Sequence, residues 1–152
     1  MLAVNIKRIC KPDPSLIKKL YEEAGMKLEE INQKFFADKN NILLAAYLKD
    51  VPAGFLYAYI LERIDSHKPI ILLYSIDVFP GYQKMGIGAS LIKDLKRRPI
   101  SKKCSEIFVL TTENNIAAKS LYKKTGGIRK NEDDVMFVFN LETNNQGPEQ
   151  AQ

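Results

Sequence analysis

Three glycines lie between a strongly apolar stretch and an amphipathic one, in the segment VFPGYQKMGIGASLI at residues 78–92. Residues 70–79 are almost continuously apolar, which predicts a strand buried at the centre of a sheet. Leu91, Ile92 and Leu95 recur at helical spacing after the glycines, with lysines on the opposite face. A glycine-rich turn that joins a strand to a helix directs several free backbone amides one way, at the positive end of the helix. Glycine also lets a ligand approach the backbone without meeting a Cβ atom.

The hydrophobic pattern of the whole chain predicts an α/β fold in the order β-α-α-β-β-β-α-β-α-β. The strands expected at 70–79 and 104–112 flank a helix, so a right-handed crossover should make them a parallel pair. The strands before them should be antiparallel, which gives a mixed, mostly antiparallel sheet with flanking helices. A last strand is expected at 135–141. Residues 1–142 are predicted to form a single domain, and the polar segment 143–152 is predicted to be disordered.

Several classes of protein are excluded by composition. The 152 residues contain no apolar run near twenty residues, so no membrane span is expected. The N-terminal apolar stretch is too short for a secretory signal. The two cysteines, Cys10 and Cys104, are not in a CxxC spacing, which predicts neither a zinc site nor a disulfide framework and fits the cytoplasm. We therefore expect a cytoplasmic protein without a metal site.

The net charge of +5 is concentrated in one region. Residues 84–103 carry seven lysines and arginines against one acidic residue, Asp94, so this segment holds +6 and the remainder about −1. Such a patch suits a polyanionic small molecule, or it is a solvated helix face. Nucleic acid is not expected as a partner, because no aromatic residues alternate with these basic side chains.

Two common phosphate-binding loops do not fit the glycine segment. Gly81 and Gly86 have the spacing of a Walker loop, but Ile87 and Gly88 follow where lysine and serine or threonine are needed. A dinucleotide-binding fingerprint fails because Leu91 occupies the third small position. The remaining interpretations are an anion site made of backbone amides and a tight turn that uses glycine for geometry alone.

Two motifs in this chain resemble the GNAT (GCN5-related) superfamily of acetyl-CoA-dependent N-acetyltransferases. The pattern [Q/R]-x-x-G-x-[G/A], after a strand that ends in V-x-P-x-[Y/W], is matched by Gln83, Gly86 and Gly88 and by Val78, Pro80 and Tyr82. A second pattern, N-x-x-A-x-x-L-Y-x-K-x-G, is matched by Asn115, Ala118, Leu121, Tyr122, Lys124 and Gly126. The expected order of strands and helices agrees with that family's fold over nearly the whole chain.

The resemblance implies where acetyl-CoA lies. Strand 70–79 would carry a bulge and splay from strand 104–112, the pantetheine arm would pair with the backbone in the gap, and the pyrophosphate would rest on the turn. The basic segment would help to neutralise the phosphates. The cofactor-binding residues implied are Ile76, Val78, Gln83, Lys84, Met85, Gly86, Ile87, Gly88, Ala89, Asn115, Ala118 and Tyr122.

Amine attack on a thioester needs a neutral amine, a donor for the oxyanion and a proton for the departing thiolate. The resemblance implies that Tyr122 is the general acid. The alternative interpretations are a core tyrosine for Tyr122 and a plain helix cap for Asn115. The backbone amide of Val78 is a candidate oxyanion donor. Asp77 is an acidic residue within an apolar strand, so it needs a partner, a cleft or water. It is the candidate base or amine-binding group; an ion pair with a lysine, and a water chain as the base, are the alternatives.

Residues 42–142 look most similar to type I aminoglycoside 3-N-acetyltransferases. The resemblance implies a small-molecule primary amine as acceptor, with aminoglycoside modification and antibiotic resistance as candidate roles, and a homodimer as a common assembly among relatives. Ser75 stands where those enzymes carry an aspartate, and the basic chain would need an acidic cleft, for which the candidates are Glu62, Asp65, Asp77, Glu132, Asp133 and Asp134. Protein or peptide N-acetylation, non-catalytic acyl-CoA binding and nucleic-acid binding are the alternatives.

Overall fold

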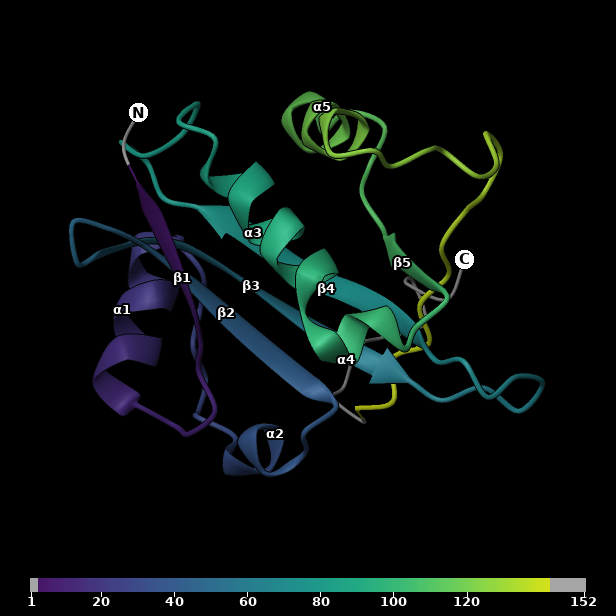
Figure 1. The fold of residues 1–152 in the computed structure, drawn as a ribbon, viewed down its shortest axis with the longest axis horizontal. Coiled ribbons are helices and arrows are strands. Elements are labelled where there is room, and N and C mark those ends of the chain that lie inside the picture. Colours follow the sequence, from purple (N-terminus) through teal and green to yellow (C-terminus); the bar gives the residue numbers. More distant parts are fainter. Residues whose placement is uncertain (1–2, 143–152) are drawn as a thin grey trace.

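Five strands form one mixed sheet in the computed structural model, which describes residues 3–142 (Figure 1). The strands lie side by side in chain order, with β1 to β4 antiparallel and β4 parallel to β5. They are β1 (Val4–Arg8), β2 (Asn41–Leu48), β3 (Val51–Leu61), β4 (Ile70–Val78) and β5 (Glu106–Val109). The predicted mixed, mostly antiparallel sheet is confirmed.

Five helices accompany the sheet: α1 (Pro14–Glu23), α2 (Gln33–Ala37), α3 (Ile87–Arg97), α4 (Pro99–Lys102) and α5 (Ile116–Lys124). Helix α1 begins where the Asp13 carboxylate accepts a hydrogen bond of 3.1 Å from the Leu16 amide. Helix α3 ends before Pro99, which starts the short α4. No helix among residues 3–142 is both long and apolar enough to cross a membrane.

The β2–β3 hairpin has a tight turn. Lys49 and Asp50 form its turn with φ angles of 49° and 64°, as two-residue hairpins require. The motif KDVPAG at 49–54 is typical of a longer turn, but β3 begins at Val51 and includes Gly54. A Cβ on Gly54 would lie 2.6 Å from the carbonyl oxygen of Asp77. Gly54 thus allows β3 to approach the end of β4 closely.

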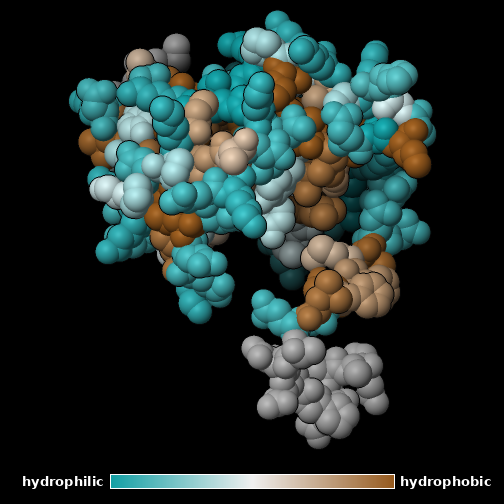
Figure 2. All heavy atoms as spheres, turned by 90° about the horizontal axis from the view of Figure 1, so that it is seen from below, coloured by the Kyte–Doolittle hydropathy of each residue, from teal (hydrophilic) through white to brown (hydrophobic). Residues whose placement is uncertain are grey.

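The predicted last strand at 135–141 is wrong. These residues have no regular secondary structure, and their large apolar side chains are 73–90% exposed. Figure 2 shows hydrophobic side chains gathered on an arm that projects from the body where the described chain ends. A strand is stabilised by pairing with a neighbour, and no segment of residues 3–142 pairs with this one. The predicted disordered tail at 143–152 lies outside the described residues.

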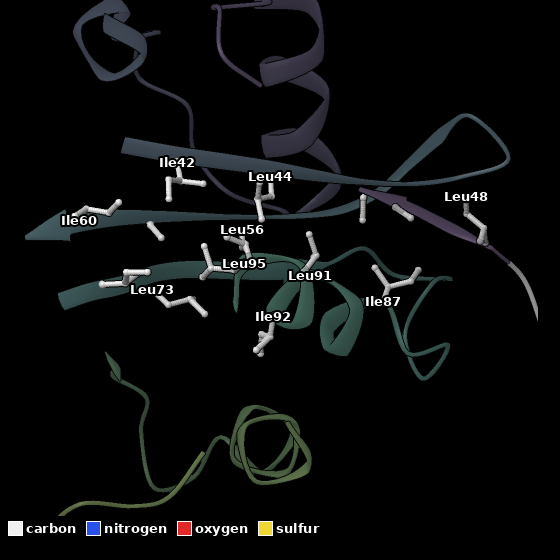
Figure 3. Packing of buried hydrophobic residues seen from close by; sticks show 14 residues of the cluster. Ile42, Leu44, Leu48, Leu56, Ile60, Leu73, Ile87, Leu91, Ile92 and Leu95 are labelled. Atoms are coloured by element: carbon white, nitrogen blue, oxygen red, sulfur yellow. The ribbon is translucent and has the colours of Figure 1, made fainter. Parts of the chain in front are cut away.

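The core lies on both faces of the sheet. On one face, Leu91 and Leu95 of α3 pack against Leu56 and Leu73 of the strands, all nearly inaccessible to solvent (Figure 3). On the other face, Leu20 of α1 packs in a second cluster with side chains from β2, β3 and the end of β4. The apolar side of α3 is therefore fixed on the sheet, and this holds its N-terminus beyond the end of β4.

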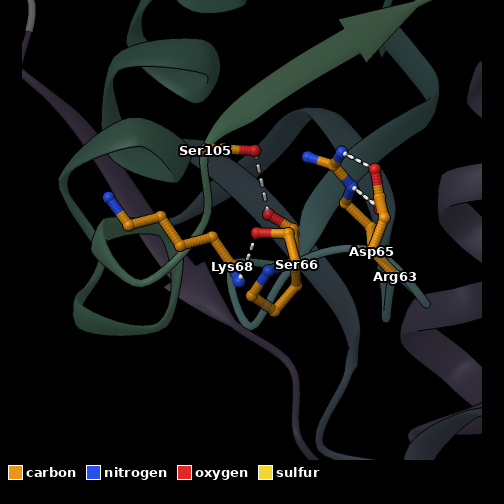
Figure 4. Close-up of polar contacts among 6 residues, drawn as sticks. Arg63, Asp65, Ser66, Lys68 and Ser105 are labelled. Carbon is orange, nitrogen blue, oxygen red and sulfur yellow. Dashed lines mark hydrogen bonds and ion pairs between the residues drawn. The ribbon is translucent and has the colours of Figure 1, made fainter.

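Strands β4 and β5 are joined at only one end. The Ser105 amide donates a 2.9 Å hydrogen bond to the Pro69 carbonyl, and the Ser105 hydroxyl contacts the same oxygen (Figure 4). Parallel pairing then runs from Ile70 to Leu73 of β4 and stops, because β5 is four residues long and shorter than predicted. The remainder of β4 continues to Val78, and no strand of residues 3–142 lies beside it on that side. The predicted splayed pair is confirmed.

Candidate active site

The open edge of β4 presents backbone amides to the gap beyond β5. The Phe79 amide donates to the Ala53 carbonyl of β3 at 2.9 Å. Successive amides of a strand point to opposite edges, so the amides of Ile76 and Val78 point away from β3. Pairing with β5 has already ended at Leu73. These two amides are therefore available to an extended ligand in the gap.

The turn after β4 continues this row of donors. Gly86 caps α3 with a φ of +81°, and no side chain in the described part of the sequence caps this helix. The first hydrogen bond of the helix runs from the Ser90 amide to the Gly86 carbonyl at 3.0 Å. The amides of Ile87, Gly88 and Ala89 therefore have no partner within the helix, at its positive end.

The glycines of this turn serve different purposes. A Cβ on Gly86 would meet no atom within 4 Å, so the space beside this residue is open. A Cβ on Gly88 would instead lie 3.0 Å from Cδ2 of Leu121 in α5. Gly81 adopts a φ of +89°, which the tight turn requires. Of these three glycines, Gly86 alone combines a left-handed conformation with a position directly before the free amides of α3.

Polar and flexible side chains surround the turn. The Gln83 side-chain amide donates to the Val78 carbonyl at 3.2 Å, which ties the turn to the end of β4. Lys84 is exposed with a φ of 62°, and Met85 is 50% exposed. The turn is consequently accessible from solvent, with a cationic side chain beside it.

Part of the basic charge of residues 84–103 has a structural role. Lys96 donates to the Thr125 carbonyl and so links α3 to α5. Arg98 pairs with Asp94 at 2.6 Å, one helical turn away. The whole excess is therefore not available to a ligand, and Lys84 is the basic side chain nearest in sequence to the free amides.

Helix α5 positions two of the predicted site residues. The Asn115 side-chain oxygen accepts a hydrogen bond of 3.1 Å from the Ala118 amide, so Asn115 is the helix cap. Tyr122 lies one helical turn beyond Ala118 and is partly buried, and burial raises the pKa of its phenol. The Gly127 amide closes the helix on the Tyr122 carbonyl at 2.7 Å.

Tyr122 borders a cavity of about 310 Å³ between the sheet and helices α3 and α5. Leu73 and Val109, the last paired residues of β4 and β5, line the same cavity. Tyr122 thus lies on the side of α3 where β4 and β5 separate. A more open hollow beside α2 contains none of the residues predicted for the site.

Asp77 lies on the opposite face of β4 from the α3 core. It is in register with Phe55 of β3, and Ser75 with Tyr57, so both share the face covered by α1. Burial raises the pKa of the Asp77 carboxyl. Within residues 3–142 no side chain forms an ion pair with this carboxylate, so the structure does not show the lysine partner that was the alternative.

An aromatic cluster on the Asp77 face was missed by sequence reasoning. A bulge in β4 at Tyr74 turns this side chain onto the rings of Tyr57 and Tyr59, with centroids 5.1 and 5.6 Å away. Phe35 of α2 packs edge-on against Tyr57 at 6.0 Å. Tyr74 is 61% exposed, and burial raises the pKa of Tyr57, which stays neutral. The alternation of aromatic residues along β3 was the available signal. The resemblance implied a bulge in strand 70–79, but nothing in the sequence places it at Tyr74.

The predicted acidic cleft is not assembled around Asp77. Asp65 lies in the β3–β4 turn, at the other end of β4, and pairs with Arg63 at 2.7 Å (Figure 4). The Arg63 hydrogen bond lowers the pKa of Asp65. Glu62 and residues 132–134 are exposed, and the Asp134 carboxylate accepts hydrogen bonds from Asn131. Asp77 is the acidic residue that the structure places beside the open edge of β4.

The comparison with known proteins agrees with this geometry. A sequence model of the acetyltransferase (GNAT) family matches residues 5–127. No curated protein sequence matches the chain. An aminoglycoside acetyltransferase from an uncultured soil metagenomic sample, solved with trehalose and with sisomicin, is 28% identical with a TM-score of 0.79, over 91% of this chain and 97% of that chain.

Two further solved structures show the shared fold alone. A second aminoglycoside acetyltransferase from an uncultured soil metagenomic sample is 20% identical with a TM-score of 0.82, over 93% of this chain and 100% of that chain. A ribosomal-protein-alanine N-acetyltransferase from Brucella melitensis biovar Abortus 2308 is 17% identical with a TM-score of 0.73, over 91% and 99%. Since the family match spans most of the sequence, the chain belongs to the acetyltransferase (GNAT) family, the N-acetyltransferases whose acyl donor is acetyl-CoA.

Proposed function

We propose that this protein transfers the acetyl group of acetyl-CoA to a primary amine of a small molecule, with aminoglycosides as the first candidates. The observation that carries the proposal is a series of backbone donors that have no partner among residues 3–142. It begins with the Ile76 and Val78 amides at the open edge of β4 and continues to the amides of Ile87 to Ala89 at the start of α3.

This row fits a long, polar and anionic donor molecule. The pantetheine amides would pair with the edge at Ile76 and Val78 as a short added strand. The pyrophosphate would accept hydrogen bonds from the helix N-terminus, where the open space beside Gly86 admits it. Gln83, Lys84 and Met85 surround the phosphates, and Asn115 and Ala118 begin the helix on the other side of the cleft.

Acetyl-CoA supplies an activated acetyl group as a thioester. In our proposal Asp77 accepts a proton from the incoming ammonium, whose pKa in water is near ~10. The Val78 amide donates to the carbonyl oxygen as negative charge develops there. Tyr122 gives its proton to the sulfur as the C–S bond breaks and the C–N bond forms. Because burial raises the pKa of Tyr122, the phenol holds this proton at neutral pH.

The aromatic cluster supports a cationic acceptor. Tyrosine faces attract ammonium groups, and Tyr74 presents an exposed ring to solvent beside Ser75. Asp77 supplies the negative charge on the same face. A ring-bearing polyamine can therefore stack on Tyr74 while one amine reaches Asp77. The soil aminoglycoside acetyltransferase with 28% identity, solved with sisomicin, supports this choice of acceptor class.

Release of free coenzyme A thiol tests the proposal directly. The protein and acetyl-CoA are combined with a panel that contains sisomicin and other aminoglycosides, a linear polyamine and a peptide with a free N-terminal alanine. Acetyl-dependent thiol release with an aminoglycoside supports the proposal, and mass spectrometry of the product locates the acetyl group. Thiol release with the peptide and with none of the aminoglycosides would instead support the alternative function, protein or peptide N-acetylation.

A further inference from the structure

The cavity beside Tyr122 is larger than an acetyl group needs. Its volume is about 310 Å³, and a group the size of a methylene occupies ~30 Å³, the share of one water molecule in the liquid. An acetyl group places a single methyl group beyond the thioester carbonyl. Most of the cavity would therefore stay unfilled by the acyl group of bound acetyl-CoA.

Strand β5 supplies an apolar wall of this cavity that is only partly covered. Ile107 and Val109 lie on one face of β5, in register with Ile71 and Leu73 of β4. The two β4 side chains are at most 2% exposed, whereas the two β5 side chains are partly buried and line the cavity. The face of the sheet that carries α3 thus has an apolar recess at β5, which suits aliphatic groups.

The far end of the cavity contains a buried hydroxyl group. Ser101 of α4 is 9% exposed, and its Oγ has no hydrogen-bond partner in the described part of the chain. Cys104 lines the same end, and its Sγ donates to the Ile100 carbonyl at 3.5 Å. Since Cys104 precedes β5 and Val109 ends it, these two residues mark opposite ends of the recess.

The direction of the bound cofactor leads into this recess. In the proposed function, the pantetheine arm pairs with β4 at Val78 and then Ile76, and the thioester lies beside Tyr122. Further along β4 in the same direction, the edge is already paired with β5 from Leu73 onward. An acyl chain that continues beyond the thioester cannot follow this edge, and the recess that begins at Val109 is the space beside it.

We infer that the preferred acyl donor carries a chain of about four to six carbons, which lies in the recess with its end toward Ser101. The inference rests on the proposed function, because the position of the thioester is taken from it. The reaction stays the same in kind: the amine nitrogen bonds to the acyl carbon, the bond from that carbon to sulfur breaks, the amine loses one proton and the departing thiolate gains one. Each methylene that enters the recess strengthens donor binding by about fourfold.

Isothermal titration calorimetry of the full chain with acetyl-, butyryl- and hexanoyl-CoA, without an acceptor amine, is the first test. We expect both longer donors to bind more tightly than acetyl-CoA, and butyryl-CoA by roughly tenfold. If acetyl-CoA bound and either longer donor bound no more tightly, the inference would be overturned while the proposed function stood. If no donor bound, the proposed function would fail as well.

Ser101→Leu fills the far end of the recess, and Ser101→Ala is the matched control that removes the hydroxyl without filling the space. Neither change removes a hydrogen bond made within residues 3–142. We expect the leucine variant to bind acetyl-CoA as the wild type does and to lose most of the added affinity for hexanoyl-CoA, which the alanine variant should keep. An equal preference for hexanoyl-CoA in both variants would show that the chain lies elsewhere.

Thiol labelling of the wild type tests the position of the chain without any substitution. Cys104 lines the recess, whereas Cys10 is exposed after β1, so one chain contains both the probe and its control. Reaction with N-ethylmaleimide is followed by mass spectrometry of the two cysteine peptides. Saturating hexanoyl-CoA should slow the labelling of Cys104 more than saturating acetyl-CoA does, with Cys10 unaffected. Equal rates at Cys104 with the two donors would contradict the inference.

Discussion

Leu121 of α5 occupies the space that a Cβ on Gly88 of α3 would need, with the added carbon only 3.0 Å from Leu121 Cδ2. Two residues earlier, a Cβ on Gly86 would extend into open space. Both glycines belong to one sequence pattern, yet the structure separates their contributions. Gly88 permits α3 and α5 to pack, and Gly86 gives the turn its left-handed backbone.

Gly88→Ala is expected to destabilise the protein by about 1 kcal/mol, because Leu121 must move to accept the extra methyl group. Leu121→Ala removes the atoms that the methyl group meets. In the double variant, Gly88→Ala should therefore cost less than in the wild type, which a double-mutant cycle of thermal or urea unfolding measures. Strictly additive changes in unfolding free energy would show that the two residues are not in contact.

Gly86→Val is expected to abolish the rise in melting temperature that acetyl-CoA gives the wild type. The β-branched side chain enters the open space beside the free amides, and at a φ of +81° it strains the turn. Gly25→Val is the matched control. Gly25 also has a positive φ, +67°, and open space around it, but it follows α1.

The control should lose a similar ~1–2 kcal/mol of stability from backbone strain and keep the full acetyl-CoA shift. Differential scanning fluorimetry with a titration of acetyl-CoA checks both variants. An acetyl-CoA shift that survives in Gly86→Val would contradict the proposed position of the pyrophosphate.

Local patterns predicted much of this fold, and the exceptions have physical causes. The turn at 83–88 was predictable, because a buried strand, glycines and an amphipathic helix follow one another within a short segment. The family resemblance implied a bulge in strand 70–79, but its position at Tyr74 was not predictable, since a run of apolar residues hides a change of face that only the register with β3 reveals. The predicted strand at 135–141 has high β propensity, but propensity does not provide a partner strand. The same is true of the candidate site. The sequence predicted the free backbone amides after β4, but it did not predict the aromatic cluster.

Tyr122→Phe is expected to lower kcat by roughly 10²-fold while the KM for acetyl-CoA changes little, because the ring remains and only the proton donor is lost. Tyr47→Phe is the control, since burial raises the pKa of that phenol as well but it lies in β2. Steady-state kinetics by thiol release measures both variants. Equal turnover in wild type and Tyr122→Phe would exclude the phenol as the acid.

Tyr74→Ala is expected to raise the KM for a cationic acceptor by about tenfold, within the range of a cation–π contact, with the KM for acetyl-CoA unchanged. Tyr74→Phe keeps the aromatic face and should behave like the wild type. For an acceptor with a neutral ring and a single amine, Tyr74→Ala should raise the KM by less. If alanine and phenylalanine at this position gave the same acceptor KM, Tyr74 would not contact the substrate.

Asp77→Asn is expected to stabilise the protein at neutral pH and to lower its turnover. Burial raises the pKa of the Asp77 carboxyl, so the folded state binds this proton more tightly than the unfolded state does. That contribution to stability is complete below the ordinary carboxyl pKa of about 4 and is lost as the pH rises through the raised value. The wild type therefore carries the cost of a half-buried charge at neutral pH, and asparagine removes it.

Melting temperatures of the two proteins measured between pH 4 and pH 8 should diverge as the pH rises, with Asp77→Asn the higher at pH 8. The rate of acetyl transfer at pH 8 should show the opposite order, with the wild type faster than Asp77→Asn. In the wild type, kcat/KM should increase as Asp77 loses its proton, whereas the asparagine variant should lack this limb of the profile, because its amide accepts no proton from the amine. A variant less stable than the wild type at pH 8 would indicate that the Asp77 carboxylate makes a stabilising contact, and a pH–rate limb that persists in the variant would assign the base to another group or to water.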